Sequence, residues 1–310
     1  MVRTAGRPLR VGVQLPEVER EVRWPEYLAM ARRVEELGYD SLWLGDHLLY
    51  RLADGSARGP WEAWTMLSAL AASTSRIRLG PLVAATAFHA PAMLAKMAAT
   101  VDEVSGGRLI LGLGAGWNEA EFRAFGFPFD HRIARFEEAF TIIRTLLRDG
   151  SIDFNGRYFQ ARDCELLPRP ARPGGPPLLI GSRGERMLRI TLPYVDAWNV
   201  WFSDTENSPA GVPPLRDLVD RICREVGRDP VAIERTVAVQ VRLTGGRGRV
   251  QGDYAQHPHA PLSGSPEVVA EELRAYAREG IAEVQLVLDP ITLASIEELA
   301  SVLELLDRAG

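Results

Sequence analysis

Short apolar runs alternate with segments of helical periodicity along most of the chain. The apolar runs are predicted as eight strands: Leu9–Leu15, Ser41–Gly45, Ile77–Val83, Leu109–Leu113, Leu178–Gly181, Asp196–Trp201, Arg235–Leu243 and Glu283–Leu288. The intervening segments repeat apolar residues at helical spacing and are predicted as helices: Trp24–Leu37, Trp61–Ala72, Pro91–Val104, His131–Arg148, Glu185–Leu192, Leu215–Val226, Pro266–Arg278 and Ile296–Ala309. The runs are apolar throughout, as expected of strands that are covered on both faces.

This regular alternation predicts right-handed crossovers and a parallel sheet. Eight strand–helix units in 310 residues fit one α/β domain over residues 1–310, a single (β/α)8 TIM barrel with loop insertions. A doubly wound sheet with an accessory domain is the alternative, but no linker divides the chain. Leu167–Pro177 is predicted as an irregular loop, and Ser203–Pro214 and Gly245–Gly264 as mobile loops.

Composition narrows the class of protein. Hydrophobic residues make up 46% and charged residues 25%, and the net charge of −5 gives no reason to expect nucleic acid or an anionic membrane. No apolar run approaches the roughly 20 residues that span a bilayer, and the first ten residues lack a signal-peptide core. Cys164 and Cys223 lie far apart and lack metal-ligand spacing, so a disulfide framework is not expected and a cytoplasmic protein is. The segment His257-Pro258-His259 has no evident third ligand, so no metal site is expected there.

The barrel prediction places the active site at the carboxyl ends of the strands. The fourth strand ends in Gly114-Ala115-Gly116, which permits a sharp turn and the close approach of a ligand. The second strand ends in Asp46-His47. A histidine at this position can hydrogen-bond a flavin-like ring or act as an acid or base. The alternative is that the pair only caps the following turn.

Two further groups of residues fall at strand ends. Gly181-Ser182-Arg183-Gly184 combines a hydroxyl, backbone N–H groups and a guanidinium, which suits a phosphate, although Ser182 alone is also an ordinary helix N-cap. Gln14, Trp117, Trp198 and Trp201 are predicted to form the walls of a substrate pocket, or to pack at its rim. The sequence contains no Gly-x-Ser-x-Gly motif and no evident strong nucleophile, so the hard chemistry is expected to belong to a bound cofactor.

Taken together, these strand ends resemble those of a known family, the luciferase-like monooxygenase superfamily, and more closely its deazaflavin branch, which uses coenzyme F420. Ser105–Trp117 is the most specific part of the resemblance. The other matching segments are GVQLP (Gly12–Pro16), ELGYDSLWLGDH (Glu36–His47), His89–Leu109, Leu111–Gly126, Arg135–Leu147, Pro176–Leu188 and DAWN (Asp196–Asn199).

The resemblance implies the same barrel, with a flavin or deazaflavin ring against the second, third and fourth strand ends. It implies that His47 lies near the reactive ring edge and that the Leu82-Val83 peptide is a non-proline cis bond against the ring. It implies further that Asp46, Ala84, Thr86 and the Gly114–Gly116 turn lie beside the cofactor, and that Gly181, Ser182 and Arg183 bind its phosphate. Two positions depart from the family pattern. Trp117 stands where some deazaflavin enzymes place an acidic glutamate, which argues against their sugar-phosphate substrates, and Ala84-Ala85 replaces a more usual polar residue.

Three functions remain open on the sequence. The leading one is an F420-dependent oxidoreductase that exchanges a hydride with a small organic molecule. The second is an FMN-dependent monooxygenase of the two-component type, which needs a closed, dry pocket. The third is a non-catalytic flavin-binding barrel. The resemblance further implies a homodimer and a separate flavin or F420 reductase.

Overall fold

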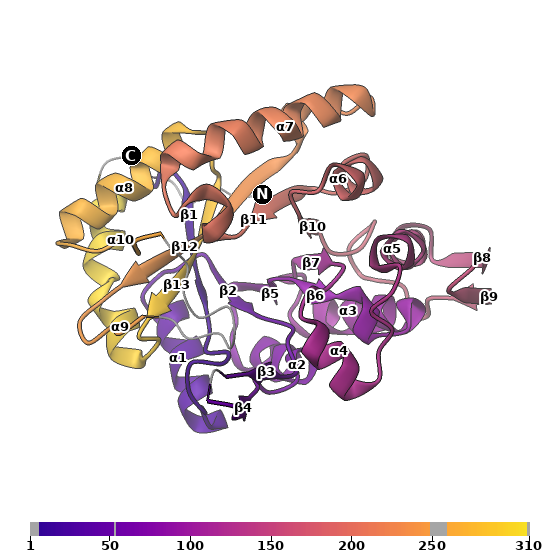
Figure 1. Ribbon diagram of the computed structural model, residues 1–310, viewed down its shortest axis with the longest axis horizontal. Coiled ribbons are helices and arrows are strands. Elements are labelled where there is room, and N and C mark those ends of the chain that lie inside the picture. The colour runs from indigo at the N-terminus through magenta and orange to yellow at the C-terminus, as the bar shows by residue number, and fades with distance from the viewer. Residues whose placement is uncertain (1–5, 53, 249–258, 309–310) are drawn as a thin grey trace.

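The computed structural model describes residues 6–52, 54–248 and 259–308 as a parallel barrel surrounded by helices (Figure 1). The barrel strands are β1 (Arg10–Gln14), β2 (Ser41–Leu44), β5 (Arg78–Pro81), β7 (Leu111–Gly114), β10 (Leu178–Gly181), β11 (Ala197–Val200), β12 (Glu234–Arg242) and β13 (Glu283–Asp289). They pair in the order β5-β2-β1-β13-β12-β11-β10-β7, and a short strand β6 (Ala84–Ala85) flanks β7. A parallel bridge between Leu79 and Leu109 joins the two edges of this sheet. The predicted (β/α)8 architecture is therefore confirmed.

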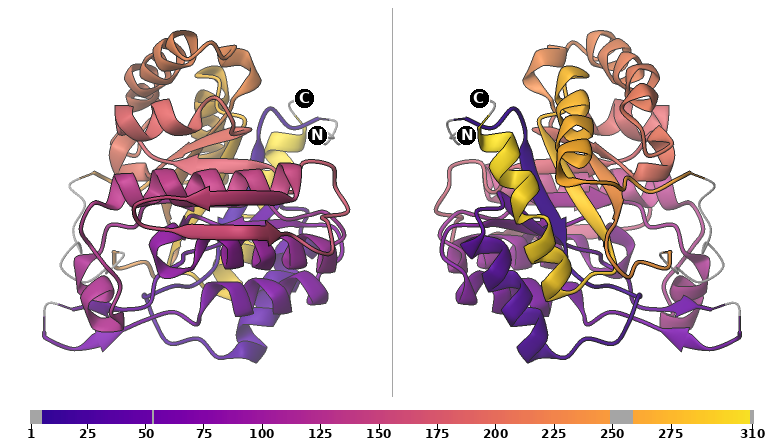
Figure 2. Two further views of the ribbon diagram at one scale, coloured as in Figure 1. Left: turned by 90° about the vertical axis from the view of Figure 1, so that its right-hand side faces the viewer. Right: turned by 90° about the vertical axis from the view of Figure 1, so that its left-hand side faces the viewer.

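The helices cover the outside of the sheet because each buries one apolar face against it (Figure 2). They are α1 (Trp24–Glu36), α2 (Ala63–Ser73), α3 (Pro91–Val104), α4 (Glu119–Phe125), α5 (Arg132–Asp149), α6 (Glu185–Thr191), α7 (Val212–Glu225), α8 (Pro266–Arg278), α9 (Leu293–Glu298) and α10 (Ala300–Asp307). The apolar periodicity predicted the bounds of α3 and α8 correctly. The predicted last helix is divided at Leu299 into α9 and α10. Within the described ranges, no helix is long and apolar enough to span a bilayer.

The prediction of a mobile loop over Ser203–Pro214 is wrong. Two 3-10 turns, Phe202–Thr205 and Pro209–Gly211, lead directly into α7. The buried side chain of Asn207 fixes this segment to β12, because it donates to the Gln240 carbonyl at 3.0 Å and accepts from the Gln240 N–H at 2.9 Å. The proline-rich composition therefore marks a helix start rather than a flexible loop.

Two small hairpins were not predicted from the sequence. Strands β8 (Ser151–Asn155) and β9 (Gln160–Glu165) form an antiparallel pair that projects beyond α5 (Figures 1 and 2). Strands β3 (Tyr50–Arg51) and β4 (Ala57–Arg58) form the second pair, directly after β2. The predicted loop Gly245–Gly264, with His257 and Pro258, lies in large part outside the described residues.

The interior of the barrel is filled below the strand ends. Trp43 is fully buried there and packs with a small cluster whose other buried members are Leu82, Ile110, Leu179 and Ala197. Gly80 makes room for it, because a Cβ at that position would lie 3.1 Å from the Trp43 ring and 2.1 Å from the Ile110 carbonyl. Side chains therefore fill the barrel interior at this level.

Candidate active site

A cavity of about 620 Å³ opens at the carboxyl ends of the strands, and its volume falls in the range of small-molecule sites. Residues at or after the ends of β1, β2, β5, β6, β7, β10 and β11 line it. Thirteen of the sixteen predicted site residues line this cavity: Gln14, Asp46, His47, Leu82, Val83, Gly114, Ala115, Gly116, Trp117, Gly181, Ser182, Arg183 and Trp201.

 

The three remaining predicted residues, Ala84, Thr86 and Trp198, do not line this cavity. Ala84 and Thr86 are buried behind the wall, where the Thr86 hydroxyl donates to the Gly114 carbonyl at 3.1 Å. Trp198 lies in the hydrophobic core and donates from Nε1 to the Ser182 carbonyl at 2.6 Å. These three side chains therefore lie in the protein interior, and two of them hydrogen-bond residues that line the cavity.

His47 stands between two buried carboxylates. Its Nδ1 lies 2.9 Å from Glu121 Oε1, and its Nε2 lies 3.6 Å from Glu17 Oε1. Glu121 also accepts the backbone N–H groups of Leu48 at 2.9 Å and Leu49 at 3.4 Å. Glu121 therefore fixes both the backbone after β2 and the orientation of the imidazole ring.

The charge of His47 is set by these neighbours. Burial disfavours the imidazolium, but the negative charge of Glu17 and the hydrogen bond and charge of Glu121 outweigh it and raise the pKa of His47. Asp46 acts in the same direction. His47 therefore lies at the cavity wall with a pKa raised by its carboxylate neighbours.

Glu17 is held in place from three sides. Gln14 donates from Nε2 to its Oε2 at 3.0 Å, and Tyr50 donates its hydroxyl to Oε1 at 2.8 Å. Gly45 leaves the space for this carboxylate, since a Cβ there would lie 2.6 Å from Glu17 Oε1. The Glu17 side chain is buried, with 3% of its surface exposed.

The bulge after β5 forms the next part of the wall. The Leu82-Val83 peptide is cis, as the family resemblance implied. Asp46 Oδ2 accepts the N–H of Ala85 at 2.8 Å and so ties this segment to the end of β2. Figure 1 shows β6, which follows the bulge, beside β7.

Glycines of two strands accommodate the Val83 side chain. A Cβ at Gly114 or Gly181 would lie 2.8 or 2.9 Å from Val83 Cγ2. Gly116 has a φ of +73°, and a Cβ there would meet the Phe122 ring at 2.6 Å. The positive φ of Gly116 agrees with the expected glycine turn. The packing of Val83 and Phe122 is a second reason why these positions require glycine.

The turn after β10 lies on the other side of the cavity. Ser182 Oγ accepts the N–H of Gly184 at 3.1 Å, and Arg183 forms an ion pair with Asp204 at 3.2 Å. The Arg183 side chain is 70% exposed, so its guanidinium retains donors for a ligand. Arg132, which donates to the Gly116 carbonyl at 2.7 Å, places a second cation at the cavity.

Sequence reasoning missed several residues that line this cavity: Glu17, Tyr50, Glu121 and Arg132. Glu17 follows the end of β1 by three residues, and a carboxylate so near a strand end was a usable signal. No local signal identified Glu121, because its separation of 74 residues from His47 along the chain hides their contact.

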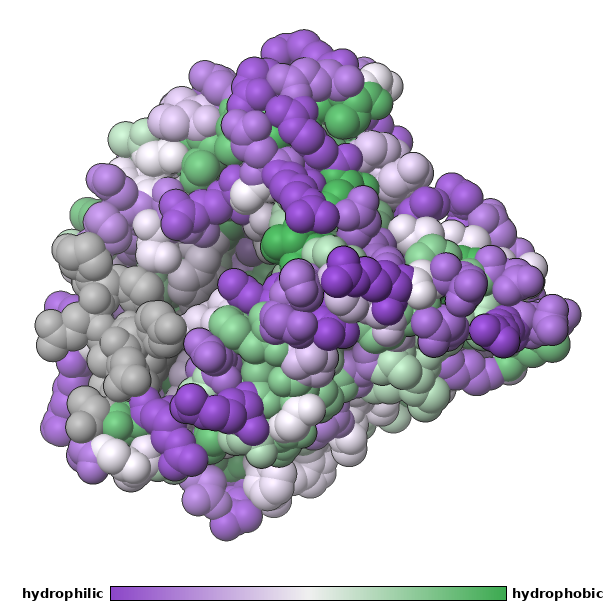
Figure 3. Space-filling view, turned by 45° about the vertical axis from the view of Figure 1, so that its right-hand side comes forward, coloured by the Kyte–Doolittle hydropathy of each residue, from purple (hydrophilic) through white to green (hydrophobic). Residues whose placement is uncertain are grey.

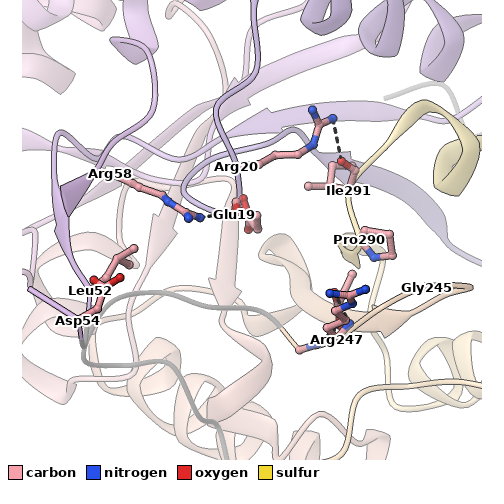
Figure 4. Close-up of a pocket in the computed structure, with 11 residues that line it drawn as sticks. Glu19, Arg20, Leu52, Asp54, Arg58, Gly245, Arg247, Pro290 and Ile291 are labelled. Carbon is pink, nitrogen blue, oxygen red and sulfur yellow. Dashed lines mark hydrogen bonds between the residues drawn. The ribbon is translucent and has the colours of Figure 1, made fainter. Parts of the chain in front are cut away.

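A second recess of about 470 Å³ lies beyond the loop after β1, beside the ends of β12 and β13 (Figure 4). Several of its polar groups have protein partners. Arg20 donates to the Ile291 carbonyl at 3.3 Å, and Arg58 donates to the Glu19 carbonyl at 2.9 Å. Asp289 accepts the N–H of Gly248 at 2.7 Å. These contacts stabilise the loops around the mouth and indicate no separate chemistry.

The surface and the described side chains give further limits. Figure 3 shows hydrophilic side chains over much of one face, with smaller apolar areas between them. Among the described residues, no group of three or more His, Cys, Asp and Glu side chains is arranged to hold a metal ion. The cavity at the strand ends is thus the candidate active site.

Comparison with known proteins places this geometry in context. A family model described as luciferase-like monooxygenase matches residues 9–248. The pyrimidine monooxygenase RutA of Enterobacter cloacae is 34% identical over 175 residues, which cover 54% of this chain and 47% of that protein. The chain thus matches about half the length of RutA. The 5,10-methylenetetrahydromethanopterin reductase of Archaeoglobus fulgidus is 25% identical over 263 residues, which cover 85% of this chain and 72% of that protein.

Solved structures share the fold. An F420-dependent secondary alcohol dehydrogenase, in complex with an F420-acetone adduct, superposes with a TM-score of 0.79 at 20% identity. The match covers 95% of this chain and 98% of that one. The TM-score establishes the common barrel, and at 20% identity the likeness concerns the fold alone.

Proposed function

The chain belongs to the luciferase-like monooxygenase family, and on this premise we propose that it is an oxidoreductase that binds coenzyme F420 and exchanges a hydride with a small organic substrate. One observation carries the proposal. His47, the cis Leu82-Val83 peptide and the Gly181–Arg183 turn line a single cavity of about 620 Å³. Residues distant in sequence thus meet where the resemblance expects a redox ring and a phosphate.

The residues of the cavity fit such a group. Gln14 Oε1 is buried without a hydrogen-bond partner among the described residues, so the site has an acceptor to spare. Ser182 and Arg183 would hold the phosphate, and Val83 would contact the ring. A deazaflavin bound there supplies a carbon that gives or takes a hydride.

The chain itself supplies the proton and the surroundings. A C=O or C=N carbon that gains a hydride needs a proton on its oxygen or nitrogen, and His47 Nε2 faces the side of the cavity where Glu17 lies. Glu121 keeps the ring in that orientation through Nδ1. Trp117 lies edge-on to His47, with ring centroids 5.3 Å apart, and with Trp201 would shield the substrate from water.

The share of this chain that each relative covers favours F420 over FMN. The methylenetetrahydromethanopterin reductase aligns over 85% of this chain, and RutA aligns over 54%. The higher identity to RutA, 34% against 25%, favours an FMN-dependent monooxygenase as the second candidate. That candidate would require a separate flavin reductase, and oxygen consumption with reduced FMN would reveal it.

A titration of the purified protein with F420 and with FMN, followed by fluorescence quenching, tests the proposal. We expect F420 to bind more tightly and its reduced form to be oxidised by members of a panel of ketones, imines and activated alkenes. Binding of FMN alone would refute the proposal. Tight binding of F420 without turnover across the panel would instead indicate a non-catalytic barrel.

The phosphate turn provides a matched pair of variants. Arg183→Ala should weaken F420 binding about tenfold, because one charge-assisted contact to a phosphate is lost. Arg224→Ala removes a guanidinium of similar exposure from α7 and should leave binding unchanged. Equal effects of the two substitutions would contradict a phosphate site at the turn. The expected homodimer remains a prediction that light scattering would test.

A further inference from the structure

The two carboxylates beside His47 differ in how they engage the ring. Glu121 uses both oxygens, one for His47 Nδ1 at 2.9 Å and the other for the N–H groups of Leu48 and Leu49. Glu17 Oε1 lies 3.6 Å from His47 Nε2, too far for a direct hydrogen bond. Nδ1 is thus committed to the protein, and the proton on Nε2 is not.

The position of Glu17 is as strongly determined as that of Glu121. Gln14 and Tyr50 donate to its two oxygens at 3.0 and 2.8 Å. Gly45 provides the space, because any side chain there would meet the carboxylate. Three separate elements, β1, β2 and β3, therefore converge to hold one negative charge beside Nε2.

We propose that Glu17 is a positioning residue of this site, which holds His47 as an imidazolium without taking up the Nε2 proton that the substrate needs. This inference rests on the proposed function. A charge at 3.6 Å stabilises the cation through space, whereas a direct hydrogen bond would compete with the substrate for the proton. The other titratable groups around the ring are Asp46, Glu121 and Tyr50, whose ring centroid lies 4.8 Å from that of His47.

The proton and electron balance follows from this arrangement. The substrate carbon receives the hydride, and the π electron pair of its C=O or C=N bond moves to the oxygen or nitrogen. That atom takes the proton from His47 Nε2, the ring becomes neutral, and solvent later returns a proton. In the proposed function the hydride would come from reduced F420, and the proton that the oxidised form no longer carries would go to solvent.

An NMR titration of the cofactor-free protein tests the inference. The His47 imidazole signals are assigned by comparison with His47→Gln, and the pKa of His47 is then measured in the parent and in Glu17→Gln. We expect Glu17→Gln to lower the pKa of His47, because a negative charge beside the cation is lost. Glu21→Gln, whose side chain is 70% exposed, is the control and should leave the pKa unchanged. An unchanged pKa in Glu17→Gln would overturn the inference.

A second variant protects the test if Glu17→Gln does not fold. Gly45→Ala keeps the charge of Glu17 but displaces the carboxylate, because the added Cβ would lie 2.6 Å from Oε1. It should lower the pKa of His47 in the same direction and by less. A pKa equal to that of the parent would count against the inference.

Turnover of reduced F420 then separates the inference from the proposed function. The rate should fall as pH rises through the pKa of His47, and Glu17→Gln should move that fall to lower pH, with about a tenfold loss of kcat at mildly alkaline pH and recovery in mild acid. Glu17→Asp should recover part of the loss. A lowered pKa without any F420 turnover in the parent would leave the positioning role intact and refute the proposed function.

Discussion

The two ends of the barrel arrange the same kinds of charge in opposite ways. At the amino ends of the strands, one carboxylate lies between two guanidiniums: Glu283 accepts from Arg10 at 3.0 Å and from Arg78 at 2.8 Å. At the carboxyl ends, one imidazole lies between two carboxylates, with His47 2.9 Å from Glu121 and 3.6 Å from Glu17. Both central groups are withdrawn from solvent.

The difference lies in what each cluster leaves available. The lower cluster is Glu283 with Arg10 and Arg78, and the upper cluster is His47 with Glu17 and Glu121. Ser41 donates a third hydrogen bond to Glu283 at 2.5 Å, and Arg10 also pairs with Glu234, so the charged groups of the lower cluster have their partners within the protein. Burial opposes the charge of Glu283, but Arg78 and Arg10 outweigh it and lower its pKa. The upper cluster leaves Nε2 of His47 at the cavity. Barrels generally use the lower end for stability and the upper end for chemistry, and the two clusters fit that division.

The largest effect is expected from a substitution that breaks the upper cluster. His47→Gln should lower kcat/KM for the F420-dependent reaction by about a thousandfold, because the proton donor is lost while the amide can still donate to Glu121. Its unfolding temperature should change less than that of Glu283→Gln. Steady-state kinetics and thermal unfolding measure the two. Full activity in His47→Gln would remove the imidazole from the chemistry.

The next effect breaks the lower cluster. Glu283→Gln leaves Arg10 and Arg78 without their central partner and should reduce the free energy of unfolding by about 3 kcal/mol. The dissociation constant of F420 should stay within about twofold, because the change lies at the far end of the barrel. Denaturant unfolding and the quenching titration check both parts. Exposed Glu304→Gln is the control and should cost less than about 0.5 kcal/mol.

A smaller effect concerns the space that Gly45 leaves for Glu17. Gly45→Ala should reduce the free energy of unfolding by about 2 kcal/mol, because the added Cβ would overlap the buried carboxylate. Gly184→Ala is a matched control, since its Cβ would meet Ser182 Oγ only at 3.7 Å, and it should change stability by about 0.5 kcal/mol or less. Equal losses in the two variants would show that Glu17 can move without cost.

The smallest effect is a difference in pH dependence. The lowered pKa of Glu283 adds stability above its unfolded-state pKa, and this is lost as pH falls through the folded-state pKa. The raised pKa of His47 adds stability below its unfolded-state pKa, and this is lost as pH rises through the folded-state pKa. The stability gap between parent and Glu283→Gln should therefore narrow in acid, and the gap for His47→Gln should narrow at alkaline pH. Parallel unfolding-temperature curves across pH would contradict this.

Local patterns along the chain determine much of the fold. The apolar runs specified the eight barrel strands, because buried parallel strands need apolar residues on both faces. The periodicity of α3 gave its bounds correctly. The segment before α7 was misjudged because its order comes from the contact of Asn207 with β12, which composition does not report.

The candidate site divides in the same way. His47 and Gly181–Arg183 were predictable because strand ends meet at one rim of a barrel. Trp198 also falls at a strand end, but the direction of its side chain puts it in the core, and this depends on which face of β11 it occupies.

The sequence by itself determined the barrel, the rim and the histidine at that rim, since alternation and strand ends are local properties of the chain. Only the tertiary structure decided that Glu17 and Glu121 flank this histidine, because Glu121 lies 74 residues from it along the chain. The charge of an ionisable group depends on what surrounds it in space, and chain order does not encode that distance.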